Sequence, residues 1–174
     1  MARAFRRVRR PPPAGGSGLT EETSRSGTIL QDGRRKAYRP LPPDRRRAAL
    51  EAGLAAYERG NFFEAHELLE PAWMGTSDLA ERSLYQGLIK LAAGYVHAVR
   101  GNPVGMTRNL YGARKYLEVS LRAGPEHGLR AGIDLPSLLV EIDKRLEAAT
   151  ALPSLVNSIP AAMLDLAEEA PPIR

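Results

Sequence analysis

The sequence predicts an all-α protein, a compact bundle of about five helices preceded by a disordered basic N-terminal tail. No segment of the 174 residues alternates apolar and polar side chains as a half-buried strand would. Every long segment instead repeats its apolar residues at helical spacing and has capping residues at its ends. The apolar content of 43% is enough for one hydrophobic core. Because the chain has no cysteine, disulfides and thiolate chemistry are excluded.

Two helices are expected at the start of the bundle, joined by a short link at Gly60. The first covers Asp44–Arg59, with Asp44 as its cap and Gly60 as its stop. The second begins at Asn61, whose side chain can form a capping box with Glu64. Pro71 removes one backbone hydrogen bond from this second helix, so we expect its last turn to be kinked or loosened.

Three more helices follow, and each has a recognisable start or stop. The first ends before a glycine, the second has Asn102 as its cap and a proline at its first position, and the third is capped by Asp134. Residues 151–174 are expected to form a weakly structured C-terminal tail. The three predicted ranges are Leu79–Arg100, Pro103–Ala123 and Leu135–Ala149.

Short links between consecutive helices favour antiparallel helical hairpins. Two hairpins in a row would also suit a stack of repeats, but the chain lacks the spaced Trp, Gly, Tyr and Pro signature of the repeat of about 34 residues. We therefore predict a single compact bundle domain over residues 44–150.

The net charge of +5 is unevenly divided along the chain. Residues 1–47 carry 13 Lys and Arg against 4 Asp and Glu, whereas the remainder carries 12 against 16. Residues 1–43 are rich in Pro and Gly and poor in apolar residues, so they cannot bury enough surface to offset the entropy of ordering. We expect a basic flexible tail there. Its charge would suit nucleic acid or another anionic surface as a partner.

Signals for export or membrane insertion are not found in the sequence. No apolar run is long enough to span a membrane, and the basic N-terminus is not followed by the apolar stretch of a secretion signal. We expect a cytoplasmic protein, since the lack of cysteine is compatible with a reducing compartment.

Polar side chains lie on the apolar face of the second predicted helix. In the stretch N-F-F-E-A-H-E-L-L-E-P-A-W, which starts at Asn61, the residues His66, Glu70 and Trp73 follow at helical spacing and share one face. An imidazole and a carboxylate are thus expected on a side that packs against the core.

A second polar stripe is expected on the helix over Leu79–Arg100, and it consists of Gln86, Lys90, Gly94 and His97. Small residues around Gly94 allow another helix to approach, and we expect that neighbour to be the helix that starts at Asn61. A buried ammonium needs a carboxylate, so we expect Lys90 to pair with Glu67 or Glu70.

Together these stretches resemble the bacterial and archaeal domain-of-unknown-function family numbered 309. The family's motif H-x-x-x-E-x-x-W/Y falls on His66, Glu70 and Trp73, and the stretch L-Y-Q-G-L-I-K-L-A-A-G-Y-V-H resembles its second segment. The resemblance covers roughly residues 44–117 and implies a helical fold and a proposed metal-binding role, with no assigned activity. Pro71, directly after the motif's glutamate, departs from the family pattern.

Two interpretations of the polar residues stay open. In the first, which we favour, they form a buried structural network in a non-catalytic or partner-binding protein without a cofactor. In the second, His66, Glu70 and His97 bind a divalent metal, zinc or iron, and Glu67 is the general base of a metal-dependent hydrolase. Lys90 opposes the second, because an ammonium repels a cation. The network comprises His66, Glu67, Glu70 and His97, supported by Trp73, Gln86 and Lys90.

Overall fold

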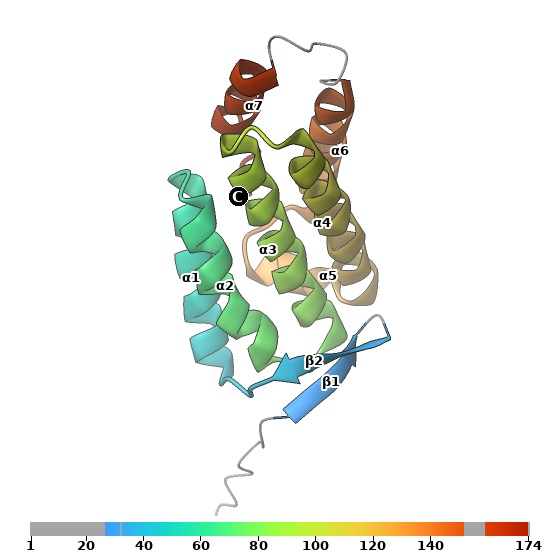
Figure 1. Ribbon diagram of the computed structural model, residues 1–174. Coiled ribbons are helices and arrows are strands. Elements are labelled where there is room, and N and C mark those ends of the chain that lie inside the picture. The colour runs from blue at the N-terminus through green and yellow to red at the C-terminus, as the bar shows by residue number, and fades with distance from the viewer. Residues whose placement is uncertain (1–26, 32, 152–158, 174) are drawn as a thin grey trace, which may run out of the picture.

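The computed structural model describes residues 27–31, 33–151 and 159–173. This part of the chain is mainly helical, which confirms the predicted fold class, and contains one small β-hairpin in addition (Figure 1). Its elements are β1 (Gly27–Gln31), β2 (Arg34–Tyr38), α1 (Pro43–Glu58), α2 (Phe62–Gly75), α3 (Leu79–Val99), α4 (Pro103–Ala123), α5 (Pro125–Arg130), α6 (Leu135–Ala151) and α7 (Ile159–Glu168).

Helices α1 to α4 lie side by side in chain order, with α3 in the middle (Figure 1). α3 packs against α2 on one side and α4 on the other, α6 packs against α4, and α7 packs against α3. The core runs through all of these layers, because Leu54, Leu69, Leu91, Leu110 and Ile142 from successive helices are almost wholly buried. No helix within the described ranges combines the length and apolar character needed to cross a membrane.

Local capping explains where several helices begin. The side chains of Asn102 and Asp134 each accept a backbone N–H from the first turn of the helix that follows, at 2.8 and 3.2 Å, as expected. The prediction of a capping box at Asn61 is wrong. The Asn61 side-chain amide donates to the Glu64 carboxylate at 3.2 Å, and its oxygen accepts no backbone N–H. α2 continues through Pro71 to its end at Gly75.

The pairs α1–α2 and α3–α4 are two copies of one helical hairpin. Their turns contain Gly60 at φ 77° and, 41 residues later, Gly101 at φ 63°, a conformation that glycine adopts without strain. Each glycine N–H donates to the carbonyl three residues before it, at 2.9 and 2.8 Å. The backbone N–H of the asparagine after each glycine donates to the carbonyl five residues before it, at 2.9 Å in both turns. The repeat is therefore present, at a longer spacing than the signature we searched for.

The equivalence extends to the contact between the helices of each hairpin. A Cβ atom placed on Gly53 would lie 2.6 Å from Leu69, and one placed on Gly94 would lie 3.2 Å from Leu110. Both glycines and both leucines are again 41 residues apart in the sequence. The small residue lets the second helix of each hairpin approach the first closely.

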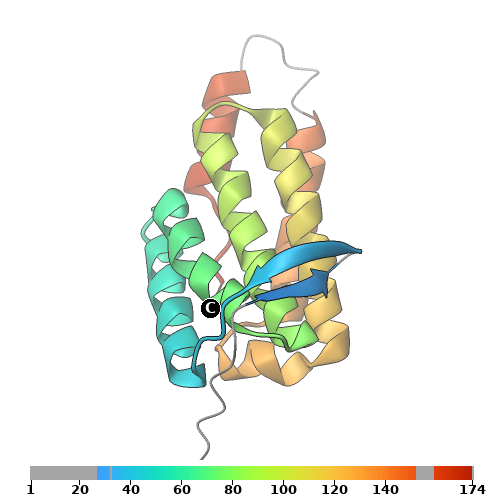
Figure 2. The same ribbon diagram turned by 60° about the horizontal axis from the view of Figure 1, so that its bottom comes forward.

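Of the flexible basic tail expected over residues 1–43, residues 1–26 and 32 lie outside the described residues, and the rest contains two strands. β1 and β2 pair antiparallel, with Gly27 opposite Tyr38 and Gln31 opposite Arg34. The hairpin lies across the ends of α2 and α3 (Figure 2). The chain after it follows α2, since Arg39 N donates to the Met74 carbonyl at 2.9 Å.

The C-terminal part of the chain is also more ordered than expected. Residues 159–168 form α7, in which Met163 is fully buried, and Ile173 beyond it is 3% exposed. The weakly structured tail was expected over residues 151–174, and α7 within it packs against α3. Between α4 and α6 lies the short helix α5.

Candidate functional site

The residues expected to form one polar cluster lie at separate places. His66 and Glu67 contact each other on α2, with 3.0 Å between Nδ1 and Oε1, and their side chains are 33% and 54% exposed. His97 lies near the end of α3, where its Nδ1 is 3.2 Å from the amide nitrogen of Asn102. Across the described residues, no three His, Asp or Glu side chains gather so that they could hold one metal ion. The ligand set of His66, Glu70 and His97 is therefore not assembled.

The prediction that Lys90 pairs with Glu67 or Glu70 is wrong. Lys90 Nζ donates to Asn109 Oδ1 on α4 at 3.3 Å. Its stem follows the same helix, because a Cβ atom on Gly112 would lie 3.3 Å from Lys90 Cδ. This part of the polar stripe of α3 faces α4 instead of α2. The long stem covers apolar surface while the ammonium is only half-buried, so an amide oxygen is a sufficient partner.

The buried polar centre of the described chain is Arg82, which is 2% exposed. Its guanidinium donates to the Gln31 side chain at 3.0 Å and to three backbone carbonyls, those of Trp73, Thr76 and Ala37, at 2.5, 3.1 and 3.2 Å. These oxygens come from both strands, from α2 and from the loop after it. One arginine therefore joins the β-hairpin to two helices.

Trp73 and Gln86 belong to this arginine centre. The Arg82 guanidinium lies 4.6 Å from the centre of the Trp73 ring, in cation–π geometry. Gln86 Oε1 accepts from the Gln31 amide. Burial lowers the pKa of Arg82 from its ordinary value, and Tyr38 opposes this shift. Of the predicted cluster, two support residues take part in a buried structural network, while no hydrogen bond within the described residues joins His66, Glu67, Glu70, Lys90 or His97 to it.

A second polar centre surrounds Glu81 on α3. Its carboxylate accepts from Arg46 Nε at 2.9 Å, from the Thr76 hydroxyl at 2.6 Å and from the Tyr85 hydroxyl at 2.8 Å. Burial by itself would raise the pKa of Glu81, but the three hydrogen bonds outweigh it and the pKa is lowered. The pKa of Tyr85 is raised, by burial first and then by Glu81. These contacts fasten α1 to α3.

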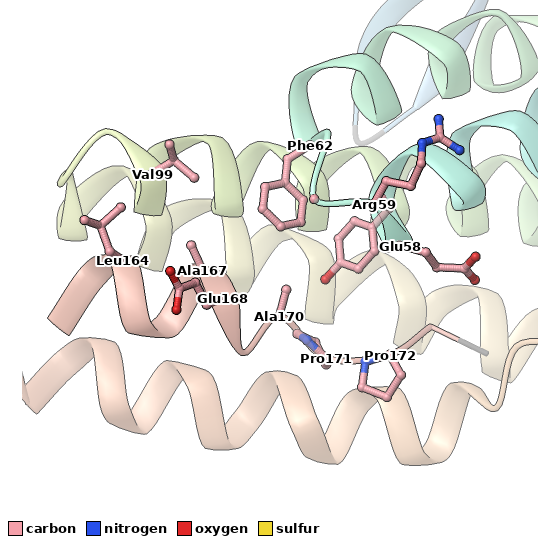
Figure 3. A pocket seen from close by; sticks show the side chains of 12 residues that line it. Glu58, Arg59, Phe62, Val99, Leu164, Ala167, Glu168, Ala170, Pro171 and Pro172 are labelled. Atoms are coloured by element: carbon pink, nitrogen blue, oxygen red, sulfur yellow. The ribbon is translucent and has the colours of Figure 1, made fainter. Parts of the chain in front are cut away.

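A hollow of about 610 Å³ lies between the α1–α2 turn, the end of α3 and the C-terminal segment. We call it the hairpin groove. Figure 3 shows Phe62 pointing into it from α2, with Val99 and Leu164 at one end and Glu58 and Arg59 at the other. Its remaining wall comes from Ala167, Glu168, Ala170, Pro171 and Pro172.

Exposed apolar side chains gather at one end of this groove. A second hollow of about 510 Å³, lined by both Phe62 and Phe63, adjoins it through Val99. Phe63, Val99 and Leu164 are 62%, 53% and 48% exposed, and we call these three residues the apolar rim. Scattered single apolar side chains are ordinary on a protein surface, whereas a cluster beside a hollow is typical of a binding surface.

Three buried polar atoms next to the groove lack a hydrogen-bond partner within the described residues, namely Tyr57 Oη, Tyr95 Oη and Arg145 Nε. The two tyrosine rings are 6.0 Å apart, and Tyr57 lines the groove. Burial raises the pKa of both tyrosines, and the positive charge of Arg145 on α6 opposes the shift in each. The phenols are thus neutral donors at neutral pH, close to a cation.

Sequence reasoning assigned no site role to Arg82, Arg145, Tyr57 or Tyr95. Arg82 lies between polar residues, Glu81 and Ser83, so the local sequence does not mark it as buried. No local signal marks Arg145, because its partners are distant in the chain.

Comparison with known proteins shows similarity over part of the chain and gives no function. The chain is 28% identical over 99 residues to the uncharacterized protein YpuF of Bacillus subtilis strain 168, a match that covers 57% of this chain and 56% of the relative. The chain thus aligns with little more than half the length of this curated relative. No solved structure matches. A family model described as a domain of unknown function, DUF309, matches residues 50–109, which confirms the resemblance seen in the sequence.

Proposed function

We propose that this protein is a non-catalytic scaffold that binds a partner protein through the hairpin groove and its apolar rim. The observation that carries the proposal is the gathering of Phe63, Val99 and Leu164, about half exposed or more, beside two adjoining hollows. In protein interfaces, a few side chains that become buried near the centre of the contact supply most of the binding energy.

The rigid frame around the groove supports this proposal. The α1–α2 turn is fixed by a glycine at positive φ and by backbone hydrogen bonds, so Phe62 and Phe63 start from a fixed position. Rigid elements lower the entropic cost of binding, because few side chains and no backbone must be ordered.

The contacts of the buried polar side chains support a structural role for these residues. Arg82 and Glu81 are each engaged by several partners that join separate elements. The hydrolase alternative needs His66, Glu70 and His97 around one ion, and this geometry gives it no support. A cytoplasmic location is part of the proposal, and fractionation of cells that produce the tagged full chain tests it.

Photo-crosslinking in cells tests the binding surface. Benzoylphenylalanine replaces Phe63, Val99 or Tyr111, one at a time, in the full chain. Tyr111 on α4 is the matched control, since it is 56% exposed but does not line either hollow. We expect one and the same partner to be crosslinked from positions 63 and 99 and not from 111.

Binding of the purified partner completes this test. Phe63→Asp should raise its Kd by at least tenfold, equal to about 1.4 kcal/mol, while the circular dichroism spectrum is unchanged. Tyr111→Asp should leave the Kd within about twofold, since this is a small fraction of that energy. Equal crosslinking from all three positions, or an unchanged Kd in Phe63→Asp, would contradict the proposal.

A further inference from the structure

One wall of the hairpin groove is formed by a piece of the same chain. After α7, residues 169–173 leave the helix, and Ala170, Pro171 and Pro172 line the groove. Pro171 and Ile173 are buried while Pro172 between them is exposed, the alternation of an extended peptide lying in a groove. Figure 3 shows Pro171 and Pro172 beyond the end of the helix, opposite the side from which Phe62 enters.

A cation anchors this segment. Arg145 Nη2 donates to the backbone carbonyl of Glu169 at 2.6 Å, and Arg145 Nη1 lies 3.8 Å from the Glu169 carboxylate. Arg145 therefore binds both a main-chain oxygen and a negatively charged carboxylate of Glu169. Arg145 is about one-fifth exposed, so most of its side chain is covered beside the segment.

The occupant leaves the polar groups beside the groove incompletely used. Tyr57 Oη, in the lining of the groove, and Arg145 Nε have no partner among the described residues while the segment is in place. Both can donate a hydrogen bond, and burial of an unpaired donor is unfavourable. A peptide that brings another carboxylate or carbonyl oxygen to these donors would bind better than the chain's own segment does.

We infer that the groove binds an extended peptide from a partner protein, one that carries an acidic residue followed by proline and an aliphatic residue, and that residues 169–173 are a replaceable internal mimic of that peptide. This inference rests on the proposed function and adds the chemistry of the partner. The acidic residue meets Arg145, and the aliphatic residue takes the place of Ile173. The mimic must leave before the partner enters.

The test uses the full chain with the double substitution Pro171→Asp and Ile173→Asp, which places charges at the two buried positions of the segment. The probe is a fluorescein-labelled synthetic peptide, D-L-A-E-E-A-P-P-I, which is the sequence of residues 165–173. Fluorescence anisotropy should give a Kd at least tenfold lower for the substituted chain than for the wild type, because the tethered segment competes at an effective concentration near the millimolar range.

Two matched variants define the specificity. Arg145→Gln in the substituted chain should weaken peptide binding at least tenfold, whereas Arg122→Gln should not, since Arg122 on α4 is 79% exposed and lies outside the groove. Tyr57→Phe should weaken binding of a peptide with an added acidic residue more than binding of the original peptide. A folded substituted chain that binds the peptide no better than wild type overturns the inference.

A measurement on the unaltered chain keeps the inference testable if the double substitution disturbs the fold. Hydrogen exchange at Ile173 should accelerate when unlabelled peptide is added in millimolar excess, and unchanged exchange overturns the inference. The two proposals fail separately. If a partner is crosslinked at Phe63 but the peptide does not bind, the proposed function stands and the inference about the peptide is rejected. If the peptide binds but crosslinks are not specific to the apolar rim, the groove is supported as a binding site and the role of the rim is rejected.

Discussion

Glu81 and Arg82 are neighbours in the sequence, yet they form contacts between α3 and different elements. Glu81 reaches Arg46 on α1, whereas Arg82 reaches Gln31, Ala37 and Trp73 in the hairpin and α2. Successive helical residues point about 100° apart, so one turn of α3 can serve both neighbours. Each side chain has enough partners to offset the cost of its burial.

The stability contributed by Glu81 should depend on pH. The pKa of Glu81 is lowered in the folded protein, so its contribution is complete above the unfolded value of about 4.3 and is lost as pH falls through the folded pKa. Glu81→Gln should lower stability by about 1–3 kcal/mol at pH 7. The difference in Tm from wild type should narrow as the pH is lowered toward about 3.

Thermal unfolding followed by circular dichroism at several pH values checks this expectation. Glu126→Gln is the control, because the Glu126 side chain is 53% exposed and lies 3.9 Å from the His127 imidazole. That control should differ from wild type by less than about 0.5 kcal/mol at every pH. A Glu81→Gln difference that stays constant with pH would show that charge is not the source of the stabilisation.

Among the elements, the helices could be predicted from the sequence and the hairpin could not. The caps at Asn102 and Asp134 act within one turn, so local sequence determines them. The β-hairpin stands in a segment whose charge suggested disorder, and the pair Asp32-Gly33, a hairpin-turn signal, was outweighed by that charge. Its order depends on Arg82, which lies far away in the sequence.

The hairpin should therefore contribute to the stability of the bundle. A chain that begins at Pro40 lacks two acceptors of the buried Arg82 guanidinium, the Gln31 side chain and the Ala37 carbonyl. It should be less stable than a chain that begins at Gly27 by roughly 2–4 kcal/mol. Urea unfolding of the two chains gives the difference directly.

Two neighbouring substitutions in the full chain test the same contact without deletion. Gln31→Ala removes one hydrogen-bond acceptor of the buried Arg82 guanidinium and should destabilise the protein. Leu30→Ala changes a side chain that is 73% exposed and should have little effect. Equal stability of the two shortened chains would mean that the bundle does not need the hairpin.

At the scale of the whole molecule, the sequence predicted which segments are helical but not which faces meet. Lys90 was assigned to the carboxylates of α2, yet it lies against Asn109 because Gly94 and Gly112 bring α3 and α4 close together. His66 and His97 were assigned to one pocket on the same assumption. Contacts between distant residues depend on how two hairpins stack, and a single sequence carries little information about that.

The two turns should respond alike to substitution, since they are equivalent. Gly60→Ala and Gly101→Ala should each cost about 1–2 kcal/mol, because alanine is strained at positive φ although the space around both positions is open. The two costs should add in the double variant. Gly112→Ala is the control, since that helical position meets only the flexible stem of Lys90 and alanine favours helices. Urea unfolding that finds very different costs for the two turns would contradict their equivalence.

The spacing of Gly60 and Gly101 also constrains how the length of this chain can change during evolution. Recombination between the two turns of the gene would remove or add 41 codons, and with them one complete pair of helices. Because the glycine, the asparagine after it and the packing leucine recur at that same interval, the junction would restore the same turn and the same glycine–leucine spacing. An insertion or deletion inside a helix that is not close to a whole number of turns would instead rotate part of that helix and expose core side chains.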